Sequence, residues 1–442
     1  MPSRPALAIA RAMRAVAAVP ILLAVATPAA AEDPDLAARV DTYVAPFVDA
    51  GHLSGSLMVA RGDDVLLERS WGWADAEHRV PNGPDTPTGI ASVTKPMTIA
   101  LVCRLAEEGL LAPEDTISRW IPDFPRGNDI TVSHLLNHRA CIPHRVTTPQ
   151  EETIPRTAAD MVELVKQAGL LPLEPGEKSV YSSAGFSVLA RVVELASGRS
   201  YDDALQHYLC EPAGMERTGH HDSRDLVPGR ARGYVLDEGG LANGPLVDLS
   251  FLVGAGSVLS TPRDLHRMLR ALVDGNLGDA APVALMRGSG LSWNGVTIGF
   301  RSFVQYRNSD DTEAIFVGNL VSGATDALAR DLADLIDGKD VATPARPNVA
   351  FAKPDPELMR RVEGTYRNDR DQAHDIRVDG DRLWFGQWLL LPTGPTTFFS
   401  PQDYANVEVV SGPDGAIERL DWARPDGTLP WRRVAGDVAA DR

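Results

Sequence analysis

Ser92 and Lys95 stand three residues apart in the segment ASVTK, residues 91–95, directly after a loop rich in glycine and proline. At the first turn of a predicted helix, this spacing places both side chains on one helical face. A serine hydroxyl becomes a good nucleophile when a base removes its proton, and a desolvated lysine with a lowered pKa can be that base. Backbone N–H groups at the helix start favour an acyl oxyanion. The alternative interpretation is a capped helix with a solvated lysine.

Four further segments follow in chain order: ITVSHLLNH (130–138), PGEKSVYSSAGFSVLARVVELASG (175–198), CEPAGMERTG (210–219) and VLSTPRDLHRML (258–269). Together with ASVTK they resemble the class C β-lactamase-related serine hydrolases, a superfamily of β-lactamases, DD-peptidases, D-aminopeptidases and esterases. The resemblance covers roughly residues 36–337. It implies an α/β fold of the β-lactamase/transpeptidase type, an antiparallel sheet with a helical subdomain. It also implies that Ser92 is the acylated nucleophile and Lys95 its activating partner.

Tyr181-Ser182-Ser183 stands where the family usually has Tyr-Xaa-Asn. A phenol held near a lysine can have its pKa lowered and act as a general base, first for acylation and then for the deacylating water. Ser183 can still donate a hydrogen bond, with a shorter reach than asparagine. The alternative for Tyr181 is a half-buried aromatic residue in a loop before a helix.

Trp293-Asn294-Gly295 stands where relatives often carry Lys-Thr-Gly or His-Xaa-Gly. Gly295 lets a substrate lie close to a strand edge, and the resemblance implies that the backbone N–H of Val296 joins that of Ser92 in an oxyanion hole. A lysine or histidine in the first position can attract a substrate carboxylate, whereas the indole of Trp293 cannot. Esterases of the superfamily can carry tryptophan there. We assign residues 293–295 and Ser183 to substrate binding. A core tryptophan at the start of a strand is the alternative.

No metal or cofactor is expected. His134 and His138 are four residues apart on a predicted helix, but no glutamate accompanies them as in a zinc protease helix, so we interpret them as core or capping residues. Residues 138–141 depart from the usual His-Thr-Ser-Gly of the family. The three cysteines are far apart and are expected to be small buried side chains. Neither a Gly-Xaa-Ser-Xaa-Gly elbow nor a phosphate-binding glycine loop is present.

The elements that must position these residues form a strand-rich frame around a helical middle. An amphipathic helix over 34–48 precedes two short runs, 55–60 and 65–71, that predict a hairpin. Further helices are predicted over 95–108, 131–138, 158–168, 187–196, 201–209, 262–273 and 326–336, with strands over 297–306 and 313–320. This order predicts one α/β domain over residues 32–340, whose sheet uses both ends of the segment.

A second, smaller domain is predicted after a proline-rich linker over residues 341–357. Residues 358–442 alternate short β-rich runs with Asp-Gly turns, which is typical of a small all-β barrel or sandwich. The segment VEGTY, residues 362–366, resembles the opening of the lipocalin-like domain that often follows this hydrolase domain. Five aromatic side chains are expected in its core: Trp384, Phe385, Trp388, Phe398 and Phe399.

The N-terminus predicts export. Three arginines precede a short apolar run, residues 15–26, which ends in small residues, and this pattern predicts a signal peptide over residues 1–31 that is cleaved after Ala31. No other segment of the 442 residues is apolar enough to span a membrane. The net charge of −17 disfavours nucleic acid as a partner.

These observations predict an exported serine hydrolase that forms an acyl-enzyme at Ser92 on a small-molecule ester or amide, most readily an ester. One alternative is a D-amino-acid peptidase, a DD-carboxypeptidase or a weak β-lactamase. A second alternative is a non-catalytic, penicillin-binding-like protein that keeps the fold. The oligomeric state is not fixed by the sequence.

Overall fold

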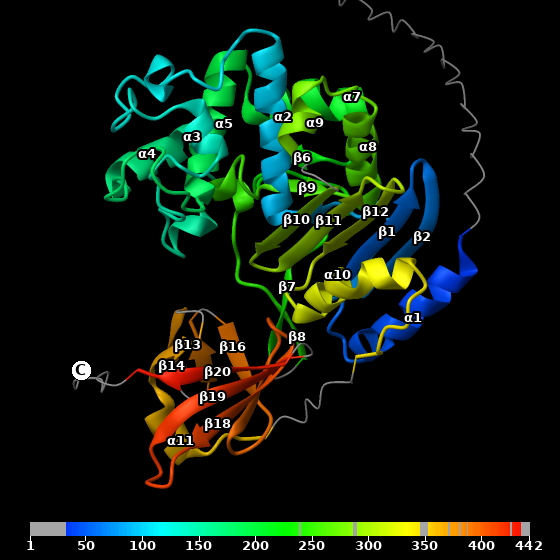
Figure 1. Ribbon diagram of the computed structural model, residues 1–442, viewed down its shortest axis with the longest axis vertical. Coiled ribbons are helices and arrows are strands. Elements are labelled where there is room, and N and C mark those ends of the chain that lie inside the picture. Colours follow the sequence, from blue (N-terminus) through cyan, green and yellow to red (C-terminus); the bar gives the residue numbers. More distant parts are fainter. Residues whose placement is uncertain are drawn as a thin grey trace, which may run out of the picture.

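The computed structural model describes residues 32–237, 240–285, 290–344, 352–369, 372–379, 382–386, 388–424 and 427–434. It has an α/β domain and, at the C-terminal end, a closed β-barrel (Figure 1). The predicted order of an antiparallel sheet with a helical subdomain, followed by a small all-β domain, is confirmed. The signal peptide, residues 1–31, lies outside the described residues and stays a prediction. No helix in the described part is long and apolar enough to cross a membrane.

The main sheet is antiparallel and joins both ends of the α/β domain. Its strand order is β10 (Gly290–Thr297), β11 (Phe300–Arg307), β12 (Thr312–Gly318), β1 (Gly55–Arg61) and β2 (Asp64–Trp71). Helices α1 (Pro34–Asp49) and α10 (Gly323–Ile336) pack side by side on one face (Figure 1). The other face packs against the helical subdomain through Val304, Ile315 and Val317.

The position of β10 differs from the prediction. A single strand was expected over residues 297–306, but a turn at Gly299, where φ is +80°, separates β10 from β11. The segment Trp293-Asn294-Gly295 therefore lies inside a strand, and this strand is the edge of the sheet. Glycine and asparagine interrupt the apolar alternation that identifies strands, so the local pattern hides β10.

The helical subdomain holds most of the remaining elements. Its helices are α2 (Thr94–Glu107), α3 (Val132–Leu136), α4 (Ala158–Ala168), α5 (Ser183–Ser197), α6 (Tyr201–Leu205) with a π-helical turn over Gln206–Cys210, α7 (Glu211–Ala213), α8 (Pro262–Val273) and α9 (Ala280–Leu285). A short sheet of β5 (Thr88–Gly89), β9 (Val258–Ser260) and β6 (Gly219–His220) joins it to the main sheet, where β5 contacts β11 and β12. Two hairpins form separate two-stranded sheets: β3 (Trp73–Asp75) with β4 (Val80–Pro81), and β7 (Tyr234–Asp237) with β8 (Gly240–Asn243). Helix α5 begins four residues before its predicted start, at Ser183.

The C-terminal barrel closes in sequence order. Its strands are β13 (Gly364–Asn368), β14 (Ala373–Asp379), β15 (Arg382–Phe385), β16 (Trp388–Pro392), β17 (Thr397–Ser400), β18 (Ala405–Ser411), β19 (Ile417–Arg424) and β20 (Gly427–Arg433). Helix α11 (Pro356–Val362) packs into its core, so ordered structure begins inside the predicted linker. Phe385 and Phe398 fill the barrel, as expected, whereas Trp384 and Trp388 are only half-buried.

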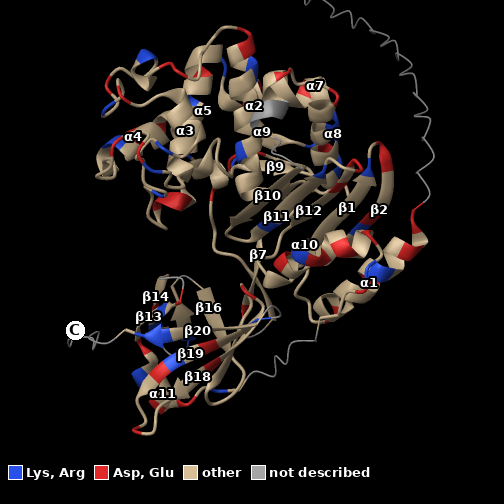
Figure 2. Ribbon diagram, in the orientation of Figure 1, with Lys and Arg blue, Asp and Glu red and all other residues tan. Residues whose placement is uncertain are grey.

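The barrel docks on the α/β domain through the turn between β17 and β18. Phe399 and Tyr404 join the apolar cluster of α1 and α10, and the ring of His52 stacks on Phe399 with centroids 5.7 Å apart. The N–H of Gly323 donates to the carbonyl of Pro401 at 2.8 Å, at the start of α10. The two domains therefore share a buried apolar contact. Acidic and basic residues are interspersed along α1 and α10 (Figure 2).

Candidate active site

Ser92 lies in a tight turn between the sheet and α2. The turn is a 3-10 helix over Ala91–Val93, and α2 follows directly. Two hydrogen bonds hold Ile90, the residue before this turn. Its N–H donates to the carbonyl of Val258 at 3.1 Å, and its carbonyl accepts from the hydroxyl of Ser302 at 2.7 Å. Ala91 has a φ of +49°, which is uncommon for a residue with a side chain. The nucleophile candidate thus stands on a constrained turn at a helix N-terminus.

Lys95 is buried beneath Ser92. Its Nζ lies 3.2 Å from Ser92 Oγ, 3.3 Å from Ser183 Oγ and 2.9 Å from the carbonyl oxygen of Ala255. Only 5% of Lys95 is exposed, and burial lowers its pKa to about 7. A large fraction of Lys95 is therefore neutral near pH 7, with a lone pair that can accept the proton of Ser92.

Tyr181 completes the group from the residue before the N-cap of α5. Its phenolic oxygen lies 3.0 Å from Ser92 Oγ, and its ring centroid lies 4.9 Å from Lys95 Nζ. Burial raises the pKa of Tyr181, although hydrogen bonds with Ser92 and Ser183 oppose this. The expectation of a lowered tyrosine pKa is therefore wrong, because burial outweighs the hydrogen bonds that favour the phenolate. In this geometry the Tyr181 hydroxyl donates to Ser92 Oγ.

Ser183 occupies the first position of α5 and is buried. It stands where the family usually has an asparagine, and its hydroxyl lies 3.3 Å from Lys95 Nζ. The structure thus brings Ser92, Lys95, Tyr181 and Ser183 together within hydrogen-bond reach.

The edge strand β10 forms the opposite wall. A cavity of about 270 Å³ lies between it and Ser92. The cavity is lined by Ala91, Ser92, His144, Arg145, Tyr181, Ser183, Leu252, Ala255, Gly256, Asn294, Val296 and Thr297. Asn294, predicted to bind substrate, and Val296, predicted to form the oxyanion hole, therefore line it.

Trp293 does not line this cavity. It pairs with Val304 of β11 and packs half-buried against the core of the helical subdomain. Gly295, on the same face, is fully enclosed. A Cβ atom there would lie 2.2 Å from the carbonyl oxygen of Ile90 and 2.5 Å from Ser302 Oγ. Gly295 therefore lets β10 approach the turn that carries Ser92.

This close approach predicts a cost for any side chain at position 295. Gly295→Ala is expected to lower the free energy of unfolding by roughly 1–3 kcal/mol, because the backbone of Ile90 cannot yield as a flexible side chain does. Denaturant unfolding measures the change. Asn294→Ala, on the exposed face of the same strand, is the control and should stay within about 0.5 kcal/mol of the parent. Equal effects of the two substitutions would contradict this interpretation of Gly295.

Three groups at the site are not recognisable in the sequence. His144 and Arg145 line the cavity, and the carbonyl of Ala255 accepts from Lys95. His144 and Arg145 stand shortly after residues 138–141, the segment that departs from the family pattern. This closeness in the chain is the one signal that could have suggested them. A backbone carbonyl leaves no trace in the sequence, because every residue has one.

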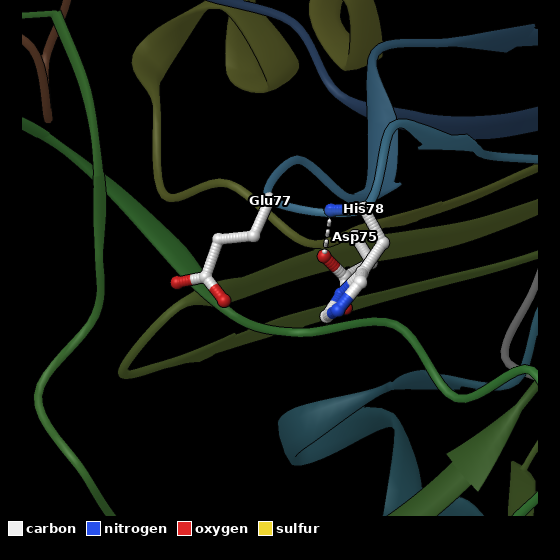
Figure 3. A group of neighbouring side chains, drawn as sticks. All are labelled: Asp75, Glu77 and His78. Carbon is white, nitrogen blue, oxygen red and sulfur yellow. Dashed lines mark hydrogen bonds and ion pairs between the residues drawn. The ribbon is translucent and has the colours of Figure 1, made fainter.

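Of the remaining candidates, His134 is a helix cap, as predicted: its Nδ1 accepts from the N–H of Thr131 at 3.3 Å. Cys141 and Cys210 are buried, Cys103 is half-buried, and all three are free thiols. Asp75, Glu77 and His78 lie close enough together to hold a metal ion (Figure 3). They are exposed or half-buried, however, and already paired. His78 binds Asp75, and Glu77 contacts Arg232 and Asn243.

Comparison with known proteins agrees with this geometry. A family profile described as Beta-lactamase matches residues 40–306. The chain belongs to the Beta-lactamase family. This is a family of serine hydrolases, so the recognised resemblance and fold class are confirmed.

Among curated family members, the chain is 27% identical to penicillin-binding protein 4* of Bacillus subtilis, over 82% of this chain and 91% of that protein. It is 29% identical to PbpX of the same organism, but there it spans only 56% of the relative's length and 51% of its own. Among solved structures, a penicillin-binding protein from Bacillus halodurans is 25% identical with a TM-score of 0.58, over 65% of this chain and 98% of that one. A D-amino acid amidase from Ochrobactrum anthropi shares the fold at 23% identity and a TM-score of 0.62, over 69% and 100%.

Proposed function

We propose that this Beta-lactamase family member is an exported serine hydrolase that acts through an acyl-enzyme on Ser92. The observation that carries the proposal is the contact of Ser92 Oγ with two proton-transfer groups. Lys95 Nζ lies 3.2 Å away and is buried with a pKa of about 7, and the Tyr181 hydroxyl lies 3.0 Å away. A hydroxyl between a neutral amine and a phenol donor has both the base and the acid that acyl transfer requires.

In acylation, Ser92 Oγ attacks the substrate carbonyl and its proton passes to Lys95 Nζ. When the tetrahedral intermediate collapses, the leaving group departs with a proton from Tyr181. The phenol then recovers a proton from the Lys95 ammonium, which returns both groups to their starting state. The backbone N–H groups of Ser92 and Val296 are the proposed donors to the oxyanion, since they lie on the two walls of the cavity. In deacylation water attacks the acyl carbonyl and its proton passes to neutral Lys95 Nζ. Ser92 Oγ then leaves with a proton from Tyr181, which recovers one from the Lys95 ammonium.

The proposed substrate is a small-molecule ester. The cavity of about 270 Å³ is compact, which suits a small acyl group. Trp293 packs against the core beside the cavity and supplies no positive charge at the position where relatives often carry lysine or histidine. Ser183, in place of asparagine, offers one polar group fewer to an amide substrate. A D-amino-acid peptidase or amidase is the second candidate, favoured by the fold shared with the D-amino acid amidase and by the match to penicillin-binding protein 4*. Nucleic acid is not a proposed partner, because the chain is acidic.

The intact mass of the mature protein after reaction with a fluorophosphonate probe tests the nucleophile. One adduct is expected on the parent protein and none on Ser92→Ala. A folded parent protein that takes no adduct would remove the enzyme proposal and favour the non-catalytic alternative. Turnover of a p-nitrophenyl ester against a D-Ala-D-Ala peptide then separates the substrate classes, and a clear preference for the peptide would overturn the ester proposal.

Because Arg145 lines the cavity, we expect the site to prefer substrates that carry a negative charge. It is the one arginine among the residues that line the cavity, and none of the other lining residues is acidic. Its contact with the buried Glu152, which does not line the cavity, is long, at 3.5 Å. Arg145→Gln is expected to lower kcat/KM for an ester with a carboxylate on its acyl group by about tenfold, the effect of one charge-assisted hydrogen bond. A neutral ester of the same size is the control substrate. An equal loss on both esters would show that Arg145 does not select charge.

A further inference from the structure

The segment that carries Tyr181 is fastened to a single loop, residues 138–144. Five hydrogen bonds join the two segments: Val180 N–H to the His138 carbonyl (2.8 Å), Ser182 N–H to His138 Nδ1 (3.2 Å), Ser182 Oγ to the Pro143 carbonyl (2.8 Å), Ser183 N–H to His144 Nδ1 (3.3 Å) and Ala184 N–H to the His144 carbonyl (3.2 Å). These contacts supply partners for N–H groups at the start of α5, which have none within the helix. The position of Tyr181 therefore depends on this loop.

Two of the acceptors are histidine rings. An imidazole nitrogen that accepts a hydrogen bond carries no proton, so His138 and His144 must both be neutral with the proton on Nε2. The same rings flank the phenol, with centroids 4.6 Å and 5.3 Å from that of Tyr181. Each histidine thus contacts both the backbone after Tyr181 and its aromatic ring.

The surroundings of the two rings favour this neutral form. Burial, followed by the charge of Lys95, lowers the pKa of His138 to about 4. Burial, followed by the charges of Arg145 and Lys95, also lowers the pKa of His144. The other titratable group against both rings is Tyr181, which is protonated and uncharged near neutral pH.

The loop also adopts costly backbone conformations. His138 and Cys141 both have a φ of +57°, in the left-handed region that residues with side chains rarely occupy. Such conformations persist where surrounding contacts impose them, and they cluster at functional sites. In this loop, Nδ1 of His138 faces the N–H of Ser182 and Nδ1 of His144 faces the N–H of Ser183, the next residue at the start of α5.

We propose that His138 and His144 are positioning residues for the acylation step. Through Nδ1 they fix the start of α5, which holds the Tyr181 hydroxyl at Ser92 and the Ser183 hydroxyl at Lys95. This inference rests on the proposed function, because it concerns the geometry of the same acyl transfer.

Paired substitutions test the proposal. Asparagine places a carbonyl oxygen near the position of histidine Nδ1 and does not titrate, whereas leucine offers no acceptor. His138→Leu and His144→Leu are each expected to slow hydrolysis of an alkyl ester, whose leaving group needs a proton, by about 100-fold, the effect of a displaced catalytic group. The corresponding asparagine variants should retain the rate within about fivefold. His134→Leu is the control, because that histidine caps α3 and contacts neither Tyr181 nor Ser183 in the described structure.

Two further measurements separate positioning from simple stabilisation. In a Tyr181→Phe background, the leucine substitutions should slow alkyl ester hydrolysis by less than about fivefold, because the proton donor that they position, the Tyr181 hydroxyl, is already missing. A full 100-fold loss in that background, or an asparagine variant as slow as its leucine counterpart, would overturn the proposal.

Nitrogen chemical shifts of labelled histidine report the tautomer of each ring in the folded full-length protein, whether or not it is active. A proton on Nδ1 of His138 or His144 would contradict the inference. An unlabelled Ser92 in the parent protein would instead overturn the proposed function, while the shifts would still show whether the rings hold the start of α5.

Discussion

Lys95→Met is expected to lower kcat/KM for an ester substrate by roughly 10²–10⁴-fold, because it removes the group that takes the proton of Ser92. Methionine fills a similar volume but has no basic nitrogen. The half-buried Lys166 on α4, paired with Asp123 and Glu163, provides the matched control. Lys166→Met should retain the parent activity. A Lys95→Met variant with activity close to that of the parent would exclude Lys95 as the base.

The pH profile of the parent protein follows from the same residue. Because burial lowers the pKa of Lys95 to about 7, the protonated form dominates below that pH and cannot accept the proton of Ser92. We expect kcat/KM to rise tenfold per pH unit below about 7 and to level off above it. Phosphonylation rates measured across this range check the expectation, and a midpoint near pH 10 would contradict it.

The burial of Lys95 also lowers the stability of the folded protein at neutral pH. An unfolded chain holds the lysine proton up to about pH 10.5, whereas the folded protein releases it above about 7. Between these values unfolding takes up a proton, so stability rises with pH. Removing the buried amine removes this penalty. Lys95→Met is therefore expected to raise the free energy of unfolding at pH 7 by roughly 1–4 kcal/mol, which denaturant unfolding measures.

The elements that the sequence predicts well carry their own boundary signals. Helix α4 begins and ends at the predicted residues, because Thr157 and Asp160 form a capping box and Gly169 ends it. Helix α8 is likewise marked by Thr261 as N-cap and Pro262 in its first turn. Such boundaries depend on side chains within a few residues, so local reasoning finds them.

The elements that the sequence does not predict depend on partners that are far away in the chain. Strand β10 is held by β11 and by the turn at Ile90 and Ala91, about 200 residues away in the chain, and no local apolar alternation marks it. The first turn of α5 consists of serine, alanine and glycine, whose helix propensity is mixed, and it is fixed by the loop over residues 138–144. These two segments form the walls of the site.

The site itself shows the same division. Ser92, Lys95 and Tyr181 are recognisable because their residue types and short spacings repeat a family pattern. The burial and the contacts that set their protonation states are not recognisable in the sequence. The pKa of Tyr181 is raised and not lowered, because burial outweighs its hydrogen bonds with Ser92 and Ser183. The sequence thus predicted which residues lie together at the site better than it predicted the charge state of Tyr181.

Tyr181→Phe is expected to slow ester hydrolysis by roughly 10²-fold, and the size of the loss should depend on the leaving group. A phenol that donates a proton matters most when the leaving alkoxide is strongly basic. The loss should therefore be large for an alkyl ester and small for a p-nitrophenyl ester, whose leaving group departs without a proton. If Tyr181 acted as a phenolate base towards Ser92, both esters would lose activity equally.

The same variant separates the roles of Tyr181 and Lys95. Phenylalanine keeps the ring that Lys95 Nζ faces at 4.9 Å, so the surroundings that lower the lysine pKa to about 7 remain in place. The midpoint of the pH profile should therefore stay within about 0.5 units of the parent value, since one hydroxyl contributes little to the burial of the amine. A midpoint shifted by several units would show that the phenol sets the protonation of the lysine. An unshifted midpoint with a loss confined to basic leaving groups would identify Tyr181 as the acid and Lys95 as the base.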